Sequence, residues 1–423
     1  MTAGQLQPMS GQTHPMDERI LAEVERAGAQ FNAVTAMTVD RATALTAESS
    51  GRRDCGQPPR RLEGIPFAIK DVIDLAGYPT TMGSAVRSDA PAIASAAVVD
   101  RLEEAGAIPV AKTNCQEYSY GILGDESAFG RVVNPVDPAL CTAGSSSGSA
   151  ALVAADAVPL ALGTDTAGSV RVPAACQGVF GFKPTFGVVP IDGVFPLSPS
   201  FDTVGLFAAD LGLLTTAFEV IAGTDPRTPV GDASGNGRTL DISLLVDESR
   251  RSADMVASVP NLTVASVNEA RLRELIDACA PIYDVVRRFE AYEVHKDLIA
   301  GRTADYQPGV RAKTLAGQGL TEAEYREQLD MLAKLRTEAT DVFAAADFLL
   351  TPAIDGPVTR WEDIDSDSAA KFMRYSMPFN VLGWPALTIP LSGAGSAEGP
   401  QSVQLVGPPG SDQSLLAFAS RLG

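Results

Sequence analysis

The chain has little histidine, which limits the bases that an active site could use. Only two histidines occur in 423 residues, His14 and His295. Histidine is the side chain whose ordinary pKa lies closest to neutral pH, and it is the commonest general base. We expect His14 to lie in a loose N-terminal tail, residues 1–15, and His295 to be a surface residue of a charged helical segment. This inventory disfavours a Ser–His–Asp hydrolase.

The usual sequence signatures of metal and nucleotide sites are also missing. The sequence contains no HExxH, no CxxC and no His/Cys/carboxylate cluster at ligand spacing, so we expect no metal. It contains no GxxxxGK[ST] loop, and no convincing GxGxxG follows a predicted strand, which leaves a nicotinamide or flavin enzyme without its usual signature. We therefore expect a protein without a cofactor.

Positive charge is scarce relative to negative charge. The 33 Lys and Arg residues against 52 Asp and Glu residues give a formal net charge of −19 at pH 7. Nucleic acid is an unexpected partner for such a surface, because phosphate binding needs clustered basic residues. The same field disfavours a strongly anionic substrate unless a local basic pocket exists.

The five cysteines and the hydrophobic pattern bear on location. The cysteines are odd in number and lack paired spacing, which is typical of reduced thiols in a cytoplasmic protein. No run of about 18 apolar residues predicts a membrane span. The N-terminal residues lack a basic start followed by an apolar core, so we expect no signal peptide. We therefore expect a cytoplasmic protein without membrane contact.

The apolar pattern that is present predicts an α/β fold. Residues 17–48 have helical periodicity, and residues 64–74 form a predicted buried strand that ends at Lys-Asp. Residues 96–114 read as a helix, a stop at Gly106 and a second strand. This order predicts a sheet with helices on its faces. Residues 347–353 and 385–391 are strand-like, with a predicted hairpin loop at 393–401.

No composition shift marks a clean domain boundary. We expect a single domain at 16–423 after the tail, with a more variable helical section at about 230–345. Within that section, residues 230–239 read as a loop and residues 268–345 as charged helices that cover the sheet.

With histidine and metals disfavoured, serine and lysine remain as catalytic candidates. Three of the seven lysines, Lys70, Lys112 and Lys183, follow apolar runs. Burial lowers a lysine pKa by up to about 3–5 units, which would populate the neutral base. The alternative is that each lysine extends from a strand end to solvent. The sequence by itself leaves the choice among the three open.

Two serine-containing stretches could hold a nucleophile. AGSSSGS, residues 143–149, has linker composition but runs directly into small apolar residues, and its match to GxSxG is weak. GTDTAGS, residues 163–169, is a small-residue turn that could aim successive backbone N–H groups at one point, as an oxyanion hole requires. The alternative for both is a Gly/Ser/Thr turn without chemistry.

Longer motifs resemble the amidase signature family of serine hydrolases. They occur in family order from about residue 60 to residue 417 and so span most of the chain. The matching segments are GIPFAIKDVID with TTMGS, GAIPVAKTN, NPVDPALCTAGSSSGSAA, GTDTAGSVRVPAACQGVFGFKPTFGVVP, SFDTVGLFA, DFLLTPA, PFNVLGWPALTIPL and SVQLVGPPG. The resemblance implies the amidase signature fold, a large mixed β-sheet core covered by helices on both faces.

The resemblance also implies a Ser–cis-Ser–Lys triad. The nucleophile would be Ser169, the bridging serine Ser145, 24 positions earlier, and the base Lys70. The peptide bond at Ser145 is expected to be cis. Neutral Lys70 would take a proton from Ser145, which takes one from Ser169, and an acyl-enzyme would follow.

Further residues gain expected roles from the same resemblance. Asp165 and Arg171 are expected to hold the loop, and Ser146 to hydrogen-bond nearby. Backbone N–H groups of the turn that ends at Ser169 would form the oxyanion hole, namely those of Thr166, Ala167, Gly168 and Ser169. The segments 115–121 and 190–199 are candidates for the pocket wall.

The chain departs from the family pattern at three positions. The family commonly has Gly-Gly-Ser-Ser-Gly-Gly-Ser where this chain has Ala143 at the first position and Ser147 at the fifth. The Gly-Gly that usually precedes the nucleophile is Ala167-Gly168. We expect these small side chains to fit, with a pocket wall that could differ.

The predicted function is hydrolysis of the C–N bond in a small or medium uncharged amide, or in a carbamate or urea-type analogue. The chain is similar to the indole-acetamide hydrolase, allophanate hydrolase and urethanase branches. One alternative is an amidotransferase A-type subunit that works with a partner, although the acidic charge argues against it. The other is a catalytically inactive binding scaffold. A small-molecule substrate is the expected partner, with a homodimer as an option.

Overall fold

The computed structural model describes most of the chain. It covers residues 18–86, 89–224, 240–244, 262–264, 269–344, 346–391 and 399–422. The predicted tail, His14, the predicted loop at 230–239 and most of the predicted loop at 393–401 lie outside the described residues.

The described strands form one mixed sheet of eleven strands, in the order β1-β3-β2-β4-β6-β5-β10-β11-β9-β7-β8. β2 pairs in parallel with both β3 and β4, whereas β4 and β6 are antiparallel. The mixed sheet that the sequence predicts is therefore confirmed. The strand bounds are β1 Val34–Met37, β2 Pro66–Lys70, β3 Ile108–Thr113, β4 Leu160–Asp165, β5 Phe180–Lys183, β6 Thr203–Ala208, β7 Leu240–Leu244, β8 Leu262–Val264, β9 Phe348–Pro352, β10 Ala386–Pro390 and β11 Ser402–Val406.

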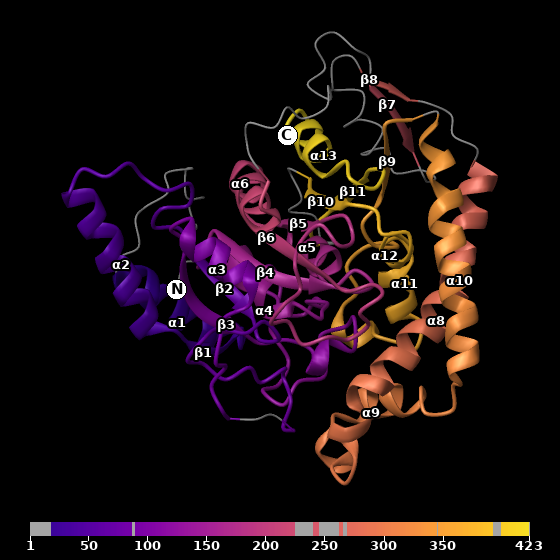
Figure 1. Ribbon diagram of the computed structural model, residues 1–423, viewed down its shortest axis with the longest axis horizontal. Coiled ribbons are helices and arrows are strands. Elements are labelled where there is room, and N and C mark those ends of the chain that lie inside the picture. Colours follow the sequence, from indigo (N-terminus) through magenta and orange to yellow (C-terminus); the bar gives the residue numbers. More distant parts are fainter. Residues whose placement is uncertain are drawn as a thin grey trace.

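Helices surround this sheet, as Figure 1 shows. α8 and α10 lie side by side along one flank of the molecule and form a core with residues of β9, β10 and β11. The helix bounds are α1 Glu18–Phe31, α2 Val39–Asp54, α3 Ala97–Glu104, α4 Ser147–Ala154, α5 Arg171–Gln177, α6 Leu211–Ala222, α8 Glu269–Ile299, α9 Pro308–Leu315, α10 Glu322–Glu338, α11 Ser368–Met373, α12 Met377–Val381 and α13 Asp412–Ala419.

Alternation along the central strands explains why helices cover both faces of the sheet. In β2, Phe67 and Ile69 join the hydrophobic core that contains α3 and α6 residues. Ala68, between them, belongs to the core that contains α1 and α4 residues. Successive side chains of a strand point to opposite faces, so a strand buried on both faces needs apolar residues at every position. The small side chain of Ala68 suits the face on which α4 packs.

One sequence prediction is wrong at the N-terminus. The continuous helical pattern at 17–48 is interrupted by β1, which pairs antiparallel with β3. α1 ends next to Asn32, which has a φ of +53° and donates from its side chain to Phe129 O at 2.8 Å. Asparagine tolerates this left-handed conformation, so it can end a helix. Four strand residues are too few to break the apparent helical periodicity.

The strand–helix–strand unit predicted at 64–114 is confirmed by β2, α3 and β3. Gly106 ends the helical part with a φ of +95°, and a Cβ there would lie 2.8 Å from Glu63 Cα. Glycine is therefore required at this turn. The strands expected at 347–353 and 385–391 are β9 and β10, and the helices expected at 268–345 are α8, α9 and α10.

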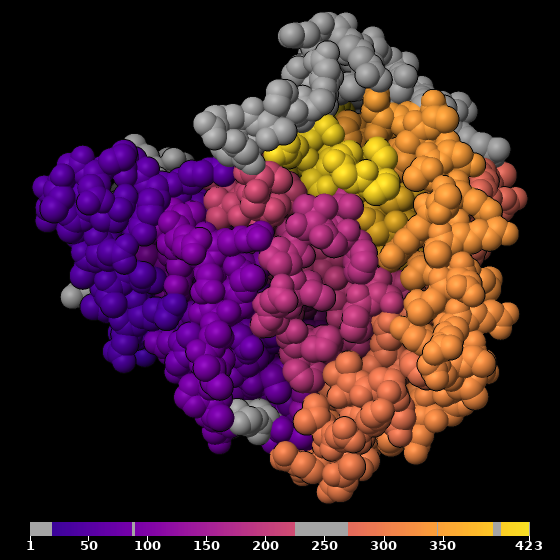
Figure 2. Space-filling view, in the orientation of Figure 1, coloured from indigo at the N-terminus to yellow at the C-terminus, as the bar shows by residue number. Residues whose placement is uncertain are grey.

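The N-terminal and later segments enclose a central region between them. Figure 2 shows residues up to about 130 on one side, the helical segment from α8 to α10 on the other, and the chain from β4 to β6 between them. This central region carries the turn that contains Ser169.

Candidate active site

Lys70 is the last residue of β2, and its side chain is completely buried. Its Nζ donates hydrogen bonds to Ser145 Oγ at 2.6 Å and to Thr164 Oγ1 at 2.7 Å. Burial lowers the pKa of Lys70 to about 8, against the opposing influence of Cys115, Asp202 and Asp165. A substantial fraction of Lys70 is therefore neutral near pH 8 and can accept a proton.

Ser145 lies in a loop that is held firmly in the interior rather than in a linker. The Gly144–Ser145 peptide bond is cis, as the sequence resemblance implies. Gly144 N donates to Ile122 O at 2.7 Å, and Gln116 N donates to Ser145 O at 3.0 Å. A Cβ on Gly144 would lie 3.0 Å from the backbone of Gly124. The stretch 143–149 has the composition of a linker because its backbone packs so closely against its neighbours that only small residues fit.

The other serines of the stretch fasten it to neighbouring backbone. Ser146 Oγ accepts from Thr164 N at 3.3 Å and donates to Thr164 O at 3.2 Å, which ties the loop to β4. Ser147 Oγ donates to Ala143 O at 2.7 Å. Ser147 replaces a glycine of the family pattern, and its hydroxyl is satisfied inside the loop itself.

Ser169 lies at the end of the turn that follows β4 and is 5% exposed. Its carbonyl oxygen accepts from Ser146 N at 3.3 Å, so the two serine stretches are in direct contact. Within the described part of the chain, no hydrogen bond joins Ser169 Oγ to Ser145 Oγ. Lys70 and Ser145 are therefore hydrogen-bonded, whereas the hydrogen bond between Ser145 and Ser169 that the expected relay needs is not formed. Such bonds often tighten only when substrate is bound.

Asp165 holds the turn in shape. Its carboxylate accepts from Gly168 N at 2.8 Å, from Arg171 Nε at 3.0 Å and from Asn380 Nδ2 at 2.8 Å. Burial on its own would raise the pKa of Asp165, but the Arg171 guanidinium outweighs it and holds that pKa well below its usual range. The pair thus fixes the loop, in agreement with the role expected for both residues.

The backbone amides of the turn fall into two groups. Gly168 N–H already donates to Asp165. The amides of Thr166, Ala167 and Ser169 donate to no acceptor among the described residues. Gly168 has a φ of +126°, and a Cβ there would overlap Ser376 Oγ. That hydroxyl donates to Ala167 O at 2.6 Å, so it supports the turn from outside.

All three candidate lysines are buried, so the alternative in which they extend to solvent is wrong. Lys112 forms an ion pair with Asp71 at 3.0 Å and donates to Ile73 O. Lys183 donates to Pro184 O at 2.8 Å. Of the three, Lys70 is the one that donates to a serine, so the geometry favours Lys70 as the candidate base.

His295 is completely buried, which corrects its assignment as a surface residue. Its Nδ1 lies 3.0 Å from Tyr306 Oη, and its ring lies edge-on to Tyr118 at 4.5 Å between centroids. Burial lowers the pKa of His295 to about 4, so it stays neutral at physiological pH. The charged neighbours of His295 in the sequence face outward from α8, while His295 faces inward. The overall charge of the segment does not reveal this single buried position.

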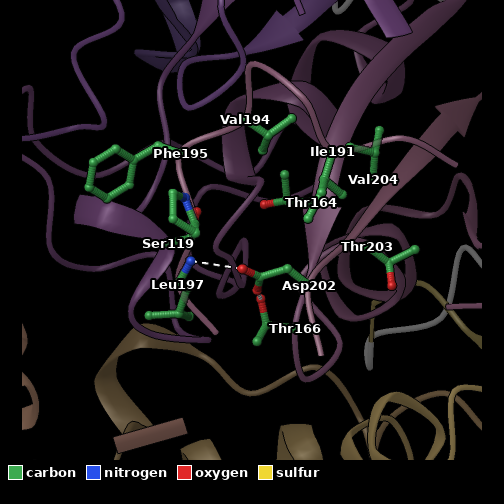
Figure 3. A pocket seen from close by; sticks show the side chains of 11 residues that line it. Ser119, Thr164, Thr166, Ile191, Val194, Phe195, Leu197, Asp202, Thr203 and Val204 are labelled. Atoms are coloured by element: carbon green, nitrogen blue, oxygen red, sulfur yellow. Dashed lines mark hydrogen bonds between the residues drawn. The ribbon is translucent and has the colours of Figure 1, made fainter. Parts of the chain in front are cut away.

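A narrow cavity with about 20 Å³ of enclosed free space lies beside the turn, and Figure 3 shows its lining. Thr164, which accepts from Lys70, and Thr166 form part of its wall. Both segments proposed from sequence as pocket walls contribute: Ser119 from 115–121, and a run of residues within 190–199. The remaining lining residues are Ile191, Val194, Phe195, Pro196, Leu197, Asp202, Thr203 and Val204.

Asp202 is a site residue that the sequence reasoning missed. Its carboxylate accepts from Thr166 Oγ1 at 2.5 Å and from Leu197 N at 2.8 Å. Asp202 thereby links the turn to the cavity wall, as the dashed line in Figure 3 partly shows. Burial raises its pKa. Asp202 could have been identified from the motif SFDTVGLFA, which contains it.

Metal clusters and membrane-spanning helices are both absent from the described residues. No group of three or more His, Cys, Asp or Glu side chains among them could hold a metal ion. No helix among them is long and apolar enough to cross a membrane.

Together the fold and the site define an α/β protein with a candidate active site of serine and lysine. The family described as Amidase matches residues 18–242 and 249–416. The chain therefore belongs to the amidase family and is an amidohydrolase.

Relatives and solved structures agree with this assignment. The chain is 32% identical to the A subunit of the glutamyl-tRNA(Gln) amidotransferase of Chloroflexus aurantiacus, over 95% of this chain and 91% of the relative. It is 30% identical to the AtzE subunit of the 1-carboxybiuret hydrolase of Pseudomonas sp. (strain ADP), over 95% and 93%. A crystal structure of an amidase matches with a TM-score of 0.83 and 29% identity, over 95% of this chain and 94% of that one. One chain of a solved structure matches with a TM-score of 0.85 and 28% identity, over 96% of this chain and 93% of that one. That structure is described as a vestigial protein complex that reveals the evolutionary origins of an s-triazine catabolic enzyme.

Proposed function

We propose that the protein hydrolyses the C–N bond of a small or medium uncharged amide through an acyl-enzyme on Ser169. The observation that carries this proposal is the 2.6 Å hydrogen bond from Lys70 Nζ to Ser145 Oγ in a fully buried setting. A buried lysine with a pKa of about 8 is a base matched to mildly alkaline conditions. In this proposal Lys70 takes the role that a histidine base has in a Ser–His–Asp hydrolase.

The proposed reaction begins with two proton transfers. Neutral Lys70 accepts the proton of Ser145, and Ser145 accepts the proton of Ser169. Ser169 Oγ attacks the amide carbonyl carbon, and the carbonyl oxygen becomes an oxyanion. When the intermediate collapses, the C–N bond breaks and the relay returns a proton to the leaving nitrogen. Water then attacks the ester by the same route and releases the acid, which regenerates Ser169.

The oxyanion would be stabilised by the backbone of the turn. The amides of Thr166, Ala167 and Ser169 are the available donors, because Gly168 N–H is engaged by Asp165. Donors held in place before the reaction stabilise developing charge without reorganisation. The proposal therefore keeps the turn that was predicted to form the oxyanion hole, but it removes Gly168 N–H from the predicted donors.

Carbamates and urea derivatives fit the same chemistry, because their carbonyl carbon also carries a C–N bond. A relative that is named as part of a 1-carboxybiuret hydrolase supports including urea-type substrates in the search. The leaving group would still be an amine, and the relay would still protonate it.

A product assay on the purified chain tests the proposal. Primary amides, anilides, carbamates and urea derivatives would be incubated with the wild type and with Ser169→Ala. We expect turnover in at least one class and its loss in the variant. Equal turnover by a folded Ser169→Ala variant would contradict the proposed nucleophile.

A second candidate function is that of a partner-dependent amidotransferase component. It is favoured by the 32% identity to the glutamyl-tRNA(Gln) amidotransferase relative over 95% of this chain. That function predicts weak activity of the chain alone and stimulation by added partner proteins. Strong hydrolysis by the isolated chain favours the amidohydrolase.

An inactive scaffold, the third alternative, would not turn over any substrate class. Formation of a homodimer also remains a proposal, which light scattering of the purified chain tests.

A further inference from the structure

The cavity beside the turn is walled mainly by apolar side chains. They come from one short segment and from β6: Ile191, Val194, Phe195, Pro196, Leu197 and Val204. Figure 3 labels all of them except Pro196. The enclosed part of the cavity is small, about 20 Å³, and its lining residue Ile191 is 40% exposed, so a compact group at its mouth fits better than an extended chain. Such a wall favours the burial of apolar surface.

Ser119 supplies a hydroxyl to this wall. Its side chain is more than nine-tenths buried, and its Oγ makes no hydrogen bond to any residue that the structure describes. The backbone is held in place, because Ser119 N donates to Gln116 O at 3.0 Å and the preceding Tyr118 N donates to Met82 O at 2.7 Å. A buried hydroxyl without a partner is costly unless a ligand or water satisfies it.

The other polar side chains of the cavity are already engaged. Thr164 accepts from Lys70, and Thr166 donates to Asp202 at 2.5 Å. Thr203 Oγ1 has a long contact of 3.5 Å to Phe201 O. Ser119 is therefore the side chain in this lining that is best placed to recognise a polar atom of a bound molecule.

The charge of the lining acts against anions. Asp202 is the one ionisable residue among those that line the cavity, and none of them is lysine or arginine. Lys70 lies behind Thr164 and must be neutral to act as a base. A carboxylate placed here would be buried without a cation and close to another carboxylate, which is strongly unfavourable.

We propose that this cavity selects uncharged, compact, mainly apolar substrate groups with one hydrogen-bonding atom facing Ser119, and that it rejects carboxylate-bearing groups. This inference rests on the proposed amide hydrolysis and specifies its substrate class. Ser119 acts here as a specificity residue, whereas the bond-breaking step belongs to Lys70, Ser145 and Ser169.

The first test addresses Ser119. Wild type and Ser119→Ala would be compared on phenylacetamide and on its 2-, 3- and 4-pyridyl isosteres, which differ by one ring nitrogen that can accept from a hydroxyl. We expect the wild type to prefer at least one pyridyl isomer by about 3- to 10-fold in kcat/KM, the range of one neutral hydrogen bond. Ser119→Ala should abolish that preference and leave phenylacetamide within about 2-fold. Ser119→Gly, which also removes the hydroxyl, should behave in the same way.

The second test addresses charge. 4-Carboxyphenylacetamide and 4-nitrophenylacetamide have similar shapes but differ in charge. We expect the wild type to prefer the nitro compound by at least about 100-fold, because burying an unpaired carboxylate is costly. Ile191 lines the cavity and is 40% exposed, so a longer side chain fits there. Ile191→Arg should reduce the preference by about 10-fold or more, whereas the uncharged control Ile191→Gln should not.

The outcomes separate this inference from the proposed function. If the neutral amides are hydrolysed, but the wild type accepts the carboxylate equally well or Ser119→Ala retains the pyridyl preference, the selectivity proposal is wrong and the hydrolase proposal stands. If no amide of either series is hydrolysed and a fluorophosphonate probe fails to label Ser169, the proposed function fails as well. Labelling of Ser169 without turnover of any of these compounds overturns the substrate class alone.

Discussion

Lys70 Nζ lies 2.6 Å from Ser145 Oγ across a separation of 75 positions in the chain. The pairing of β2 with β4 explains how this contact arises. The two strands are parallel, with Ala68 opposite Ala161, so their carboxyl ends meet at one edge of the sheet. Lys70 ends β2, and Thr164 near the end of β4 accepts from it and also binds the loop after Ser145. The edge of the sheet thus collects the base, the bridging serine and the turn that carries Ser169.

The first prediction separates Lys70 from a second buried lysine. Lys70→Met should lower kcat/KM by at least about 100-fold, because general-base catalysis contributes roughly 10²–10⁴-fold. Lys183→Met is the matched control, since Lys183 is equally buried but, among the residues that the structure describes, donates to Pro184 O and to no serine. It should keep most of the activity. Thermal unfolding of both variants verifies that they are folded, and full activity in folded Lys70→Met would refute the mechanism.

The second prediction concerns pH. Lys70 acts as a base only when neutral, and its pKa is lowered to about 8 by burial. Activity should therefore rise with pH through about 8 and reach a plateau above it. The profile of kcat/KM for an uncharged amide measures this directly. Because the pKa of Lys183 is also lowered, to about 7, the profile should be recorded again with Lys183→Met. If kcat/KM rises with pH in the same way in Lys183→Met, the group that titrates is not Lys183.

Much of the fold could be predicted from the sequence, and the family resemblance also predicted the contact between Lys70 and Ser145. The apolar run before Lys70 predicted β2, and the order of strand, helix, Gly106 and strand predicted the unit that follows. A strand that is buried on both faces has apolar residues at successive positions, and this run is a clear signal in the sequence. The choice of Lys70 over Lys112 could not come from local pattern, because both lysines follow apolar strand residues. It depends on which strand end faces the serines.

Other features were beyond the reach of local sequence. β1 is an edge strand of four residues between two helices, and its pairing with β3 is a non-local contact. His295 is buried because α8 turns that face toward Tyr118 and Tyr306, which neighbouring charged residues in the sequence conceal. The engagement of Gly168 N–H by Asp165 depends on the exact course of the turn, which composition does not specify.

The third prediction concerns Gly168. Gly168→Ala adds a Cβ that would overlap Ser376 Oγ and lie 2.8 Å from Val172, at a φ of +126° that alanine disfavours. The turn would shift, and a shift of about 1 Å can cost about 100-fold in rate. Gly301→Ala is the control, because Gly301 has a φ of +75° but no atom within 4 Å of the added Cβ. It should lose a little stability and no activity. Comparable activity in the two variants would contradict the role of the turn.

The fourth prediction concerns the buried pair of Asp165 and Arg171. Arg171→Met leaves the carboxylate buried without its cation and should cost about 3–5 kcal/mol in the free energy of unfolding. Arg326→Met removes a pair in which both side chains are about two-thirds exposed or more, and it should cost less than about 1 kcal/mol. Urea denaturation measures both.

The same pair predicts the direction of the pH dependence. The pKa of Asp165 is depressed in the folded state, so its stabilising contribution is fully present above its unfolded value near 4. The contribution is lost as the pH falls through the folded value. Stability of the wild type should therefore fall in acid with a component that Arg171→Met lacks. Parallel pH curves for the two proteins would argue against this assignment.

The most direct test of the central claim is to trap the acyl-enzyme. Rapid acid quench during turnover of an activated amide, followed by peptide mass spectrometry, should find the acyl mass on the peptide that contains Ser169. The adduct should be absent in Ser169→Ala and should form more slowly in Lys70→Met and Ser145→Ala. Acylation of another side chain during normal turnover would contradict the account.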